Sequence, residues 1–322
     1  MTIPIFLFSL PRSGSTLIQK ILMGHPDINS VAEPWLLLPF VYSIRKQGIL
    51  AEYGHSLAFK GINDFISALP NQRSDYIDAL REMALCLYDK QNRHSEKFFL
   101  DKTPRYHTII KEIYETFPHA KFLFLFRQPH QIYCSIIQTW GKGRLNYQYP
   151  YAIDLIQGPT NLVEGVKLIG NQSLTFQYED LINHPHMILK NICNYLEIDF
   201  RESMLENFSS RLPASGMGDQ TGERSYQNID DRSLNKWKET IITPFRKKKI
   251  LDYVSNLNDD IFETQRYSKD SILNDILSVE VPNKVSFRDY FDVVIDNVSR
   301  IAKPNIWLGE ENRKWAPKKF LY

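Results

Sequence analysis

Residues 5–16 read Ile-Phe-Leu-Phe-Ser-Leu-Pro-Arg-Ser-Gly-Ser-Thr, and this stretch decides the fold of the chain. Its first four residues are continuously apolar, which is typical of a strand that is buried on both faces of a sheet. The residues after it place apolar side chains at helical spacing, namely Leu17, Ile18, Ile21 and Leu22. The pattern therefore predicts a buried strand, a short polar turn and a helix in direct succession.

The turn between that strand and helix has the chemistry of an anion site. Successive backbone N–H groups at a helix N-terminus form a cradle for a tetrahedral anion. Gly14 lets the backbone approach such an anion closely, and Arg12 adds positive charge and forked donors. Further donors are the hydroxyls of Ser13, Ser15 and Thr16. Taken alone, the same residues are also consistent with a helix cap after a flexible turn.

The turn does not have the form of a nucleoside triphosphate loop. The GxxxxGK[ST] motif needs a glycine where Ser9 stands and a lysine where Ser15 stands. Without that lysine, and without an obvious aspartate to hold magnesium, an ordinary NTPase is disfavoured.

The overall composition is that of a globular protein of one large or two modest domains. The chain has 322 residues, of which 43% are hydrophobic and 24% are charged. Lys and Arg number 39 against 37 Asp and Glu, which leaves a net charge of +2. The chain therefore lacks the basic excess that would indicate duplex nucleic acid or an anionic membrane as its main partner.

The cysteines and the N-terminus indicate the compartment. Cys86, Cys134 and Cys193 are odd in number and far apart, which argues against a disulfide framework or a structural zinc site. The apolar run of residues 3–10 contains Pro4 and is too short for a signal peptide or a membrane span. We therefore expect a soluble, cytoplasmic protein.

Short apolar runs alternate with amphipathic helical patterns along the rest of the chain. Further strands are predicted at residues 98–100, 121–126 and 174–176. Helices are expected after each strand, the first of them with Thr103 as its N-cap and Pro104 as its first residue. This alternation is typical of an α/β fold with a mainly parallel sheet.

The remaining segments are interpreted from composition. Residues 141–170 are rich in Gly, Tyr and Pro and are predicted to form an irregular excursion. Residues 211–231 are polar and are predicted to form a functional loop. We divide the chain into a main domain, residues 1–265, and a C-terminal extension, residues 266–322, packed on the same domain.

Together with four later motifs, residues 10–16 resemble the phosphosulfate-binding loop of sulfotransferases that use 3′-phosphoadenosine-5′-phosphosulfate (PAPS). The later motifs, in family order, are Phe-Leu-Asp-Lys-Thr-Pro-Arg-Tyr at 99–106, Phe-Leu-Phe-Arg at 124–127 followed by Ser135, Tyr-Glu-Asp-Leu at 178–181, and Lys-Trp at 236–237. The resemblance spans roughly residues 3–255. It implies an α/β, P-loop-NTPase-like three-layer fold, in which helices flank a central, mainly parallel sheet. It also implies in-line transfer of a sulfuryl group to a hydroxyl acceptor, with adenosine 3′,5′-bisphosphate (PAP) as product and no metal.

The resemblance assigns the donor site to particular residues. Residues 12–16 would hold the 5′-phosphosulfate, and Arg127 and Ser135 would hold the 3′-phosphate. The alternative for Arg127 is a surface ion pair at the end of a strand. Tyr178 and Lys236 resemble nucleotide contacts, although Tyr178 is also consistent with a buried tyrosine whose hydroxyl is satisfied.

The acceptor hydroxyl needs a general base at neutral pH. Glu33 resembles the catalytic carboxylate of tyrosylprotein and related glycan sulfotransferases, and the neighbouring Pro34 and Trp35 would shield it from water. One alternative is that Glu33 is a loop carboxylate paired with a lysine. The other is that His25 is the base, although the sequence His-Pro-Asp after the first helix also suits a helix terminator.

Two further residues complete the catalytic set of Glu33, Lys102, Arg12 and Ser225. The resemblance implies that Lys102, at the end of a strand, stabilises the leaving phosphate. Ser225 resembles a serine that contacts the sulfuryl region in tyrosylprotein sulfotransferases. Asp101 is expected to orient Lys102 or Arg105.

The sequence departs from the family pattern in two places. Gln128 stands where many relatives have an acidic residue or Asn, and the Gly-rich ending RKGxxGDWK of small-molecule sulfotransferases is absent. These departures favour a glycan or peptide acceptor over a steroid or phenol.

The general resemblance to bacterial enzymes of surface polysaccharides makes a glycan or glycan precursor our expected acceptor. Aromatic residues that would offer flat faces to sugars, or else anchor loops, are Trp35, Trp140, Tyr147, Tyr149 and Tyr151. The alternatives are a hydroxyacyl chain on a carrier protein and a non-catalytic nucleotide-binding module. Retention of Arg12, Glu33 and Lys102 argues against the module, because binding alone needs no base.

Overall fold

The computed structural model describes residues 2–51, 53–92, 94–146, 148–206, 208, 229 and 231–302. Within them, five parallel strands form one sheet in the order β2-β3-β1-β4-β5. The strands are β1 (Ile3–Phe8), β2 (Ile28–Ser30), β3 (Phe98–Asp101), β4 (Lys121–Phe126) and β5 (Ser173–Gln177). The parallel sheet and the strands expected at 5–8, 98–100, 121–126 and 174–176 are thus confirmed, and the short β2 is an addition.

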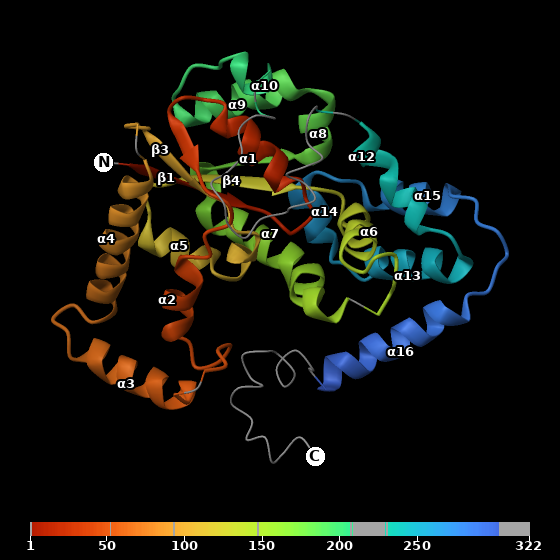
Figure 1. Cartoon of the computed structure of the whole chain (residues 1–322), viewed down its shortest axis with the longest axis horizontal. Coiled ribbons are helices and arrows are strands. Elements are labelled where there is room, and N and C mark those ends of the chain that lie inside the picture. The colour runs from red at the N-terminus through yellow and green to blue at the C-terminus, as the bar shows by residue number, and fades with distance from the viewer. Residues whose placement is uncertain are drawn as a thin grey trace.

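Helices cover both faces of this sheet (Figure 1), which confirms the three-layer arrangement. One face is covered by α1 (Ser15–Met23), α8 (Tyr178–Asn183), α9 (Pro185–Leu196) and α10 (Ser203–Glu206). The other face is covered by α2 (Leu37–Ser43), α4 (Arg73–Gln91), α5 (Ile110–Thr116), α6 (Pro129–Thr139) and α7 (Gly158–Ile169). Beyond these lie α3 (His55–Ser67), α12 (Arg232–Asn235), α13 (Pro244–Ser255), α14 (Asp259–Gln265), α15 (Lys269–Ser278) and α16 (Phe287–Ala302).

The two central strands, β1 and β4, are buried on both faces because their apolar runs do not alternate with polar residues. Successive strand side chains point to opposite faces, so the two runs supply both cores. Phe6, Phe8, Phe122 and Phe124 belong to the core beneath α5 and α7. Ile5, Leu7, Leu123 and Leu125 belong to the core beneath α1 and α9.

The expectation of an irregular excursion over residues 141–170 is wrong in its second half. A π-helical turn spans Ile153–Gln157 and α7 follows directly. The glycines that suggested a loop are close-packing points instead, because a Cβ on Gly158 would lie 2.4 Å from Leu10 and one on Gly165 would lie 2.7 Å from Ile110.

The predicted cap of the helix after β3 is also wrong in part. Pro104 begins a short 3₁₀ helix, Pro104–Thr108, before α5. Thr103 makes no side-chain cap, because its oxygen accepts instead from the backbone N–H of Trp35 at 3.2 Å, while its hydroxyl donates to Asp101 Oδ1 at 3.2 Å. The polar loop expected at 211–231 lies almost wholly outside the described residues, as do residues 303–322.

The C-terminal part of the chain contacts the main body in several places. α15 packs against α13, and α16 is held by ion pairs to Arg144 and Arg246. Across the described ranges, no helix combines the length and the apolar character that crossing a membrane requires.

The turn after β1 depends on a glycine. Gly14 adopts φ +94°, in the left-handed region that favours glycine, and a Cβ there would lie 2.3 Å from the ring of Tyr178. The ring therefore lies directly against the backbone of the turn and fixes its shape.

Gly14→Ala is expected to lower the free energy of unfolding by about 2 kcal/mol or more, through overpacking and backbone strain. Gly61→Ala is the matched control, because Gly61 lies in α3 with open space around its Cβ position. That variant should be neutral or more stable by about 0.5–1 kcal/mol. Urea titration of the three proteins makes the comparison, and equal stability of Gly14→Ala and wild type would contradict the packing argument.

Candidate functional site

Each of the five parallel strands leads into a residue that the sequence assigns to the site. In parallel strands the carboxyl ends meet at one edge, where ligands bind in open α/β sheets. β1 leads into residues 9–16 and β2 into the segment that holds Glu33. Lys102, Arg127 and Tyr178 directly follow β3, β4 and β5. The candidate site is therefore assembled by strand direction, although its residues are far apart in the chain.

A cavity of about 200 Å³ lies at that edge. Its walls include six of the predicted residues, namely Arg12, Gly14, Ser15, Thr16, Glu33 and Arg127. The aromatic side chains of Trp35, Trp140 and Tyr151 also line it, as does Arg105. The cavity thus has the anion loop on one side and a carboxylate among aromatic rings on another.

Arg12, Ser135 and Arg127 form one group. Arg12 Nε donates to Ser135 Oγ at 3.2 Å, and Arg127 Nη1 donates to the carbonyl of Arg12 at 3.0 Å. Arg127 also donates to Gln131 Oε1 at 3.0 Å and to the carbonyl of Ser233 at 2.9 Å. Arg127 as a whole is 9% exposed, so among the described residues it does not form the surface ion pair considered for it.

Tyr178 is a packing residue in this structure. Its side chain is fully buried, its hydroxyl is 2.8 Å from Ser233 Oγ, and Arg127 lies 4.4 Å from its ring centre. Together with its contact to Gly14, this agrees with the buried tyrosine that the sequence left open.

Glu33 and Lys102 form an ion pair at the cavity. Lys102 Nζ lies 3.0 Å from Glu33 Oε1, and Trp35 Nε1 donates to Glu33 Oε2 at 3.3 Å. The side chain of Lys102 is 1% exposed and that of Glu33 is 16% exposed. The carboxylate therefore faces the cavity while the ammonium lies behind it.

Asp101 does not orient Lys102 or Arg105 by hydrogen bonding, contrary to expectation. Its carboxylate is fully buried and accepts from Tyr88 at 2.7 Å, Tyr106 at 3.0 Å and Thr103 at 3.2 Å. Burial raises the pKa of Asp101 to about 6, in spite of those three donors.

This network positions the segment that carries the carboxylate. Thr103 Oγ1 accepts from the backbone N–H of Trp35 at 3.2 Å, and the Tyr106 hydroxyl accepts from that of Leu37 at 3.1 Å. Asp101 therefore supports residues 33–37 through two intermediaries. Sequence reasoning missed this role, because the partners Tyr88 and Leu37 belong to helices with no motif of their own.

His25 lies away from the cavity and is not the base in this arrangement. Its Nε2 is 3.0 Å from the carbonyl of Asp199, and its Nδ1 accepts from the backbone N–H of Asp27 at 3.1 Å. Burial lowers its pKa. The alternative interpretation, a residue that terminates α1, fits these contacts.

Lys102, Ser135 and Tyr178 do not line the cavity but contact residues that do. The other three predicted site residues have no such contact in the described part of the chain. The Ser13 hydroxyl donates to the carbonyl of Leu10 at 2.7 Å, so it stabilises the turn itself. Lys236 is exposed on the 3₁₀ helix Lys236–Thr240 and does not line the cavity. Ser225 lies outside the described residues.

Arg105 is a cavity residue whose buried partner the sequence did not reveal. Its Nε lies 2.8 Å from Asp154 Oδ1, and its Nη2 donates to the carbonyl of Pro150 at 3.1 Å. Asp154 is fully buried and also meets His107 Nε2 at 3.0 Å. The available signal was a charged residue in an apolar stretch, Ala-Ile-Asp-Leu-Ile at 152–156.

The sheet order, the anion loop after β1 and the edge location define a P-loop-like α/β protein. The model of the sulfotransferase family matches residues 4–202, more than half of the chain, and the chain belongs to that family. The family resemblance seen in the motifs is thereby confirmed.

Two known proteins are similar to this chain over part of their length. The nodulation protein NoeE of Sinorhizobium fredii is 27% identical over 255 residues, covering 72% of this chain and 59% of NoeE. A protein-tyrosine sulfotransferase of Drosophila melanogaster is 23% identical over 250 residues, covering 72% of this chain and 46% of the relative. The chain thus matches less than two thirds of the length of either relative.

Two solved structures share the fold. The sulfotransferase domain from the curacin biosynthetic pathway superposes with a TM-score of 0.51 and 22% identity, covering 88% of this chain and 99% of that domain. The sulfotransferase domain of the Synechococcus PCC 7002 olefin synthase superposes with a TM-score of 0.51 and 23% identity, covering 82% and 94%.

The pKa of Asp101 makes stability depend on pH in a defined direction. Between pH about 4 and 6 the folded chain keeps a proton that the unfolded chain has lost, so raising the pH favours unfolding. The free energy of unfolding should fall by up to about 3 kcal/mol across this window because of Asp101. Asp101→Asn should lack this component, as measured by urea titration at several pH values. Parallel pH profiles for the two proteins would contradict the assignment.

Proposed function

We propose that the chain transfers a sulfuryl group from PAPS to a hydroxyl group of a glycan or glycan precursor. The observation that carries the proposal is the cavity itself, which Glu33 lines together with the anion loop, with Lys102 paired behind Glu33. Binding an anion needs the loop alone, whereas a carboxylate in the same cavity suits proton transfer. In this structure Glu33 has the lysine partner that the sequence left open, so the proposal requires the bound donor to engage Lys102.

In this proposal the anion loop and the group formed by Arg12, Arg127 and Ser135 bind different parts of the donor. Backbone N–H groups at the start of α1, with the hydroxyls of Ser15 and Thr16, would hold the 5′-phosphosulfate. Arg127 and Ser135 would hold the 3′-phosphate, the group that distinguishes PAPS from ATP. Their existing bonds to Arg12 keep the two anion sites in fixed relation.

The acid–base step uses the ion pair. With the donor bound, its anionic oxygens compete with Glu33 for the Lys102 ammonium. Lys102 would then stabilise the oxygen that leaves with PAP, and Glu33 Oε1 would be free to accept the proton of the acceptor hydroxyl. Sulfuryl transfer places demands on a site like those of phosphoryl transfer, so positioning and charge stabilisation carry most of the rate.

The aromatic walls favour a sugar acceptor over a carrier-bound acyl chain. Trp140 and Tyr151 stack with ring centres 4.1 Å apart, and both line the cavity together with Trp35. An acidic carrier protein would be favoured by a basic rim. Arg105 at this rim is already paired with buried Asp154, so its charge is largely compensated.

Calorimetry with PAP tests the donor site. We expect micromolar binding of PAP and much weaker binding of ATP and AMP. Arg127→Ala should weaken the binding of PAP at least tenfold, because charged hydrogen bonds to phosphate contribute about 1.5–3 kcal/mol. The same variant should lose far less affinity for adenosine 5′-phosphosulfate, which lacks the 3′-phosphate.

Arg73→Ala is the matched control, because Arg73 pairs with Glu115 on the surface and is remote from the cavity residues in the fold. Equal losses for the two nucleotides with Arg127→Ala would remove Arg127 from the 3′-phosphate site. Preference of the wild type for ATP would contradict the proposed donor.

Glu33→Gln tests the base. Transfer of labelled sulfate from PAPS to an acceptor found by screening glycans should slow about 10²–10⁴-fold. PAP affinity should stay nearly unchanged, because glutamine keeps the shape of the side chain. Glu115→Gln, a surface glutamate, serves as the control with normal turnover. A near-normal rate for Glu33→Gln would exclude Glu33 as the base.

A further inference from the structure

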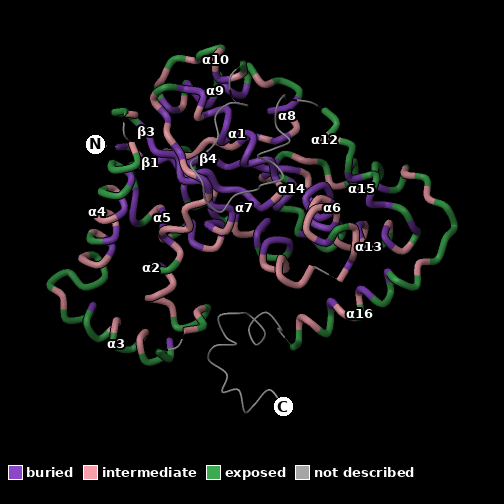
Figure 2. The backbone as a smooth tube through the Cα atoms, viewed as in Figure 1, coloured by how far each residue is buried: buried purple, intermediate pink, exposed green. Residues whose placement is uncertain are grey.

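Helix α16 is amphipathic in the reverse sense of an ordinary surface helix. Its three aspartates, Asp289, Asp292 and Asp296, are 1%, 0% and 4% exposed. Phe287 and Ile301, by contrast, are 84% and 86% exposed. Figure 2 shows this alternation of buried and exposed positions along the helix. The helix therefore turns its aspartates toward the protein and most of its large apolar side chains outward.

The exposed apolar residues of α16 form a continuous line. They recur every three or four positions, so they share one face of the helix. This α16 stripe consists of Phe287, Tyr290, Phe291, Val294, Val298 and Ile301, each at least half exposed. Surface helices of globular proteins place such a face in the core, so this one needs a different apolar environment.

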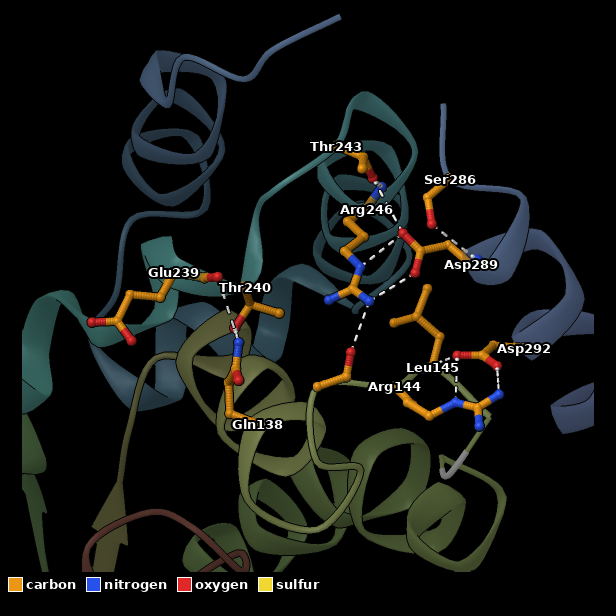
Figure 3. A network of polar contacts seen from close by, with 11 residues as sticks. Gln138, Arg144, Leu145, Glu239, Thr240, Thr243, Arg246, Ser286, Asp289 and Asp292 are labelled. Atoms are coloured by element: carbon orange, nitrogen blue, oxygen red, sulfur yellow. Dashed lines mark hydrogen bonds and ion pairs between the residues drawn. The ribbon is translucent and has the colours of Figure 1, made fainter. Parts of the chain in front are cut away.

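Ion pairs fix this orientation (Figure 3). Asp289 accepts from Arg246 Nε at 2.9 Å and from Nη2 at 2.7 Å, and both side chains are almost fully buried. Asp292 pairs with Arg144 and also accepts from the backbone N–H of Leu145 at 3.1 Å. Rotating the stripe inward would break a buried ion pair and leave a charge uncompensated, which is strongly unfavourable.

Asp296 adds a third anchor near the C-terminal end of the helix. It accepts from the backbone N–H groups of Gln148 and Tyr149 at 2.9 and 2.6 Å, and Arg300 Nε lies 2.9 Å from its other oxygen. The acidic face is therefore satisfied along its whole length by the protein itself.

The exposed charges on the described segment that leads into the stripe and carries it are mainly positive. Between residues 280 and 302 the exposed charged residues are Glu280, Lys284 and Arg288. Lys249 lies 5.9 Å from the ring centre of Phe245, and that ring is 4.1 Å from the ring of Tyr290. The sequence that follows, residues 303–322, contains five Lys or Arg against two Glu, with two Trp.

We propose that the α16 stripe, flanked by Lys284 and Arg288, docks the protein on an anionic membrane surface. Apolar side chains would enter the headgroup boundary while the basic residues meet acidic lipids. Charge complementarity distinguishes this partner from two others. A second copy of the helix, or the basic segment 303–322 folded back on it, would bring positive charges together with no exposed aspartate of α16 to offset them.

The surface has a bearing on the acceptor, and this part rests on the proposed function. α16 accepts hydrogen bonds from the backbone N–H groups of Leu145, Gln148 and Tyr149. The adjoining Pro150 and Tyr151 contact Arg105 and Trp140 at the cavity. A membrane on the stripe would therefore contact the element that supports the acceptor wall. An acceptor attached to a lipid is then the chemical class that fits.

Sedimentation of the whole chain with lipid vesicles tests the surface without reference to catalysis. We expect binding to vesicles of phosphatidylcholine with phosphatidylglycerol, at least tenfold weaker binding to phosphatidylcholine alone, and loss of binding as salt is raised. The double variant Phe291→Glu with Val298→Glu should reduce binding at least tenfold, because both positions face outward.

Phe65→Glu is the matched control, because Phe65 is 68% exposed on the distant helix α3 and should leave vesicle binding unchanged. PAP calorimetry on the same proteins shows whether each variant is folded, so failure of the surface and failure of the donor site are separate results.

Three outcomes would overturn the proposal. The first is that the wild-type protein does not bind anionic vesicles, or binds neutral vesicles equally well. The second is a dimer in light scattering that the double variant converts to monomer, which would assign the stripe to a second copy. The third is vesicle binding that appears only after deletion of residues 303–322, which would assign the stripe to that segment.

Discussion

The ring of Tyr178 lies against the backbone of Gly14 and beneath the guanidinium of Arg127, and the rest of the site depends on this contact. It joins the turn after β1 to the ends of β4 and β5, so the three segments cannot move independently. Arg127 extends the connection by binding the carbonyl of Arg12, whose side chain reaches Ser135. A side chain on residue 14 would force these parts to separate, because the ring has no room to move inward.

The second half of the site is held by a buried acid rather than by the loop. Asp101 takes three hydroxyl donors and, through Thr103 and Tyr106, fixes the backbone beside Glu33. Burial of Asp101 away from solvent disfavours its ionised form and therefore raises its pKa. The anion loop and the carboxylate are thus supported by separate networks, which meet at the cavity.

The C-terminal helix follows the same principle of buried charge on a larger scale. Asp289 and Asp292 of α16 pair with arginines of the main body, and Asp296 accepts from two backbone N–H groups there, so the helix is attached by polar contacts. Apolar residues that would normally attach a helix are left for another environment. The net charge of +2 hides this arrangement, because it does not record where the paired and unpaired charges lie.

The sequence by itself determined the α/β class, the strands at 5–8 and 121–126, the anion loop and the family, because these depend on local runs of residues. It also named Glu33 and Lys102, but their pairing joins positions 69 residues apart. Local patterns carry no record of such distances, so only the tertiary structure decided that Asp101 supports the Glu33 segment and that His25 lies elsewhere. The helix α7 was missed for the same reason, since Gly158 and Gly165 are explained by the neighbours Leu10 and Ile110. The outward face of α16 likewise follows from its ion-pair partners, which lie on distant segments of the chain.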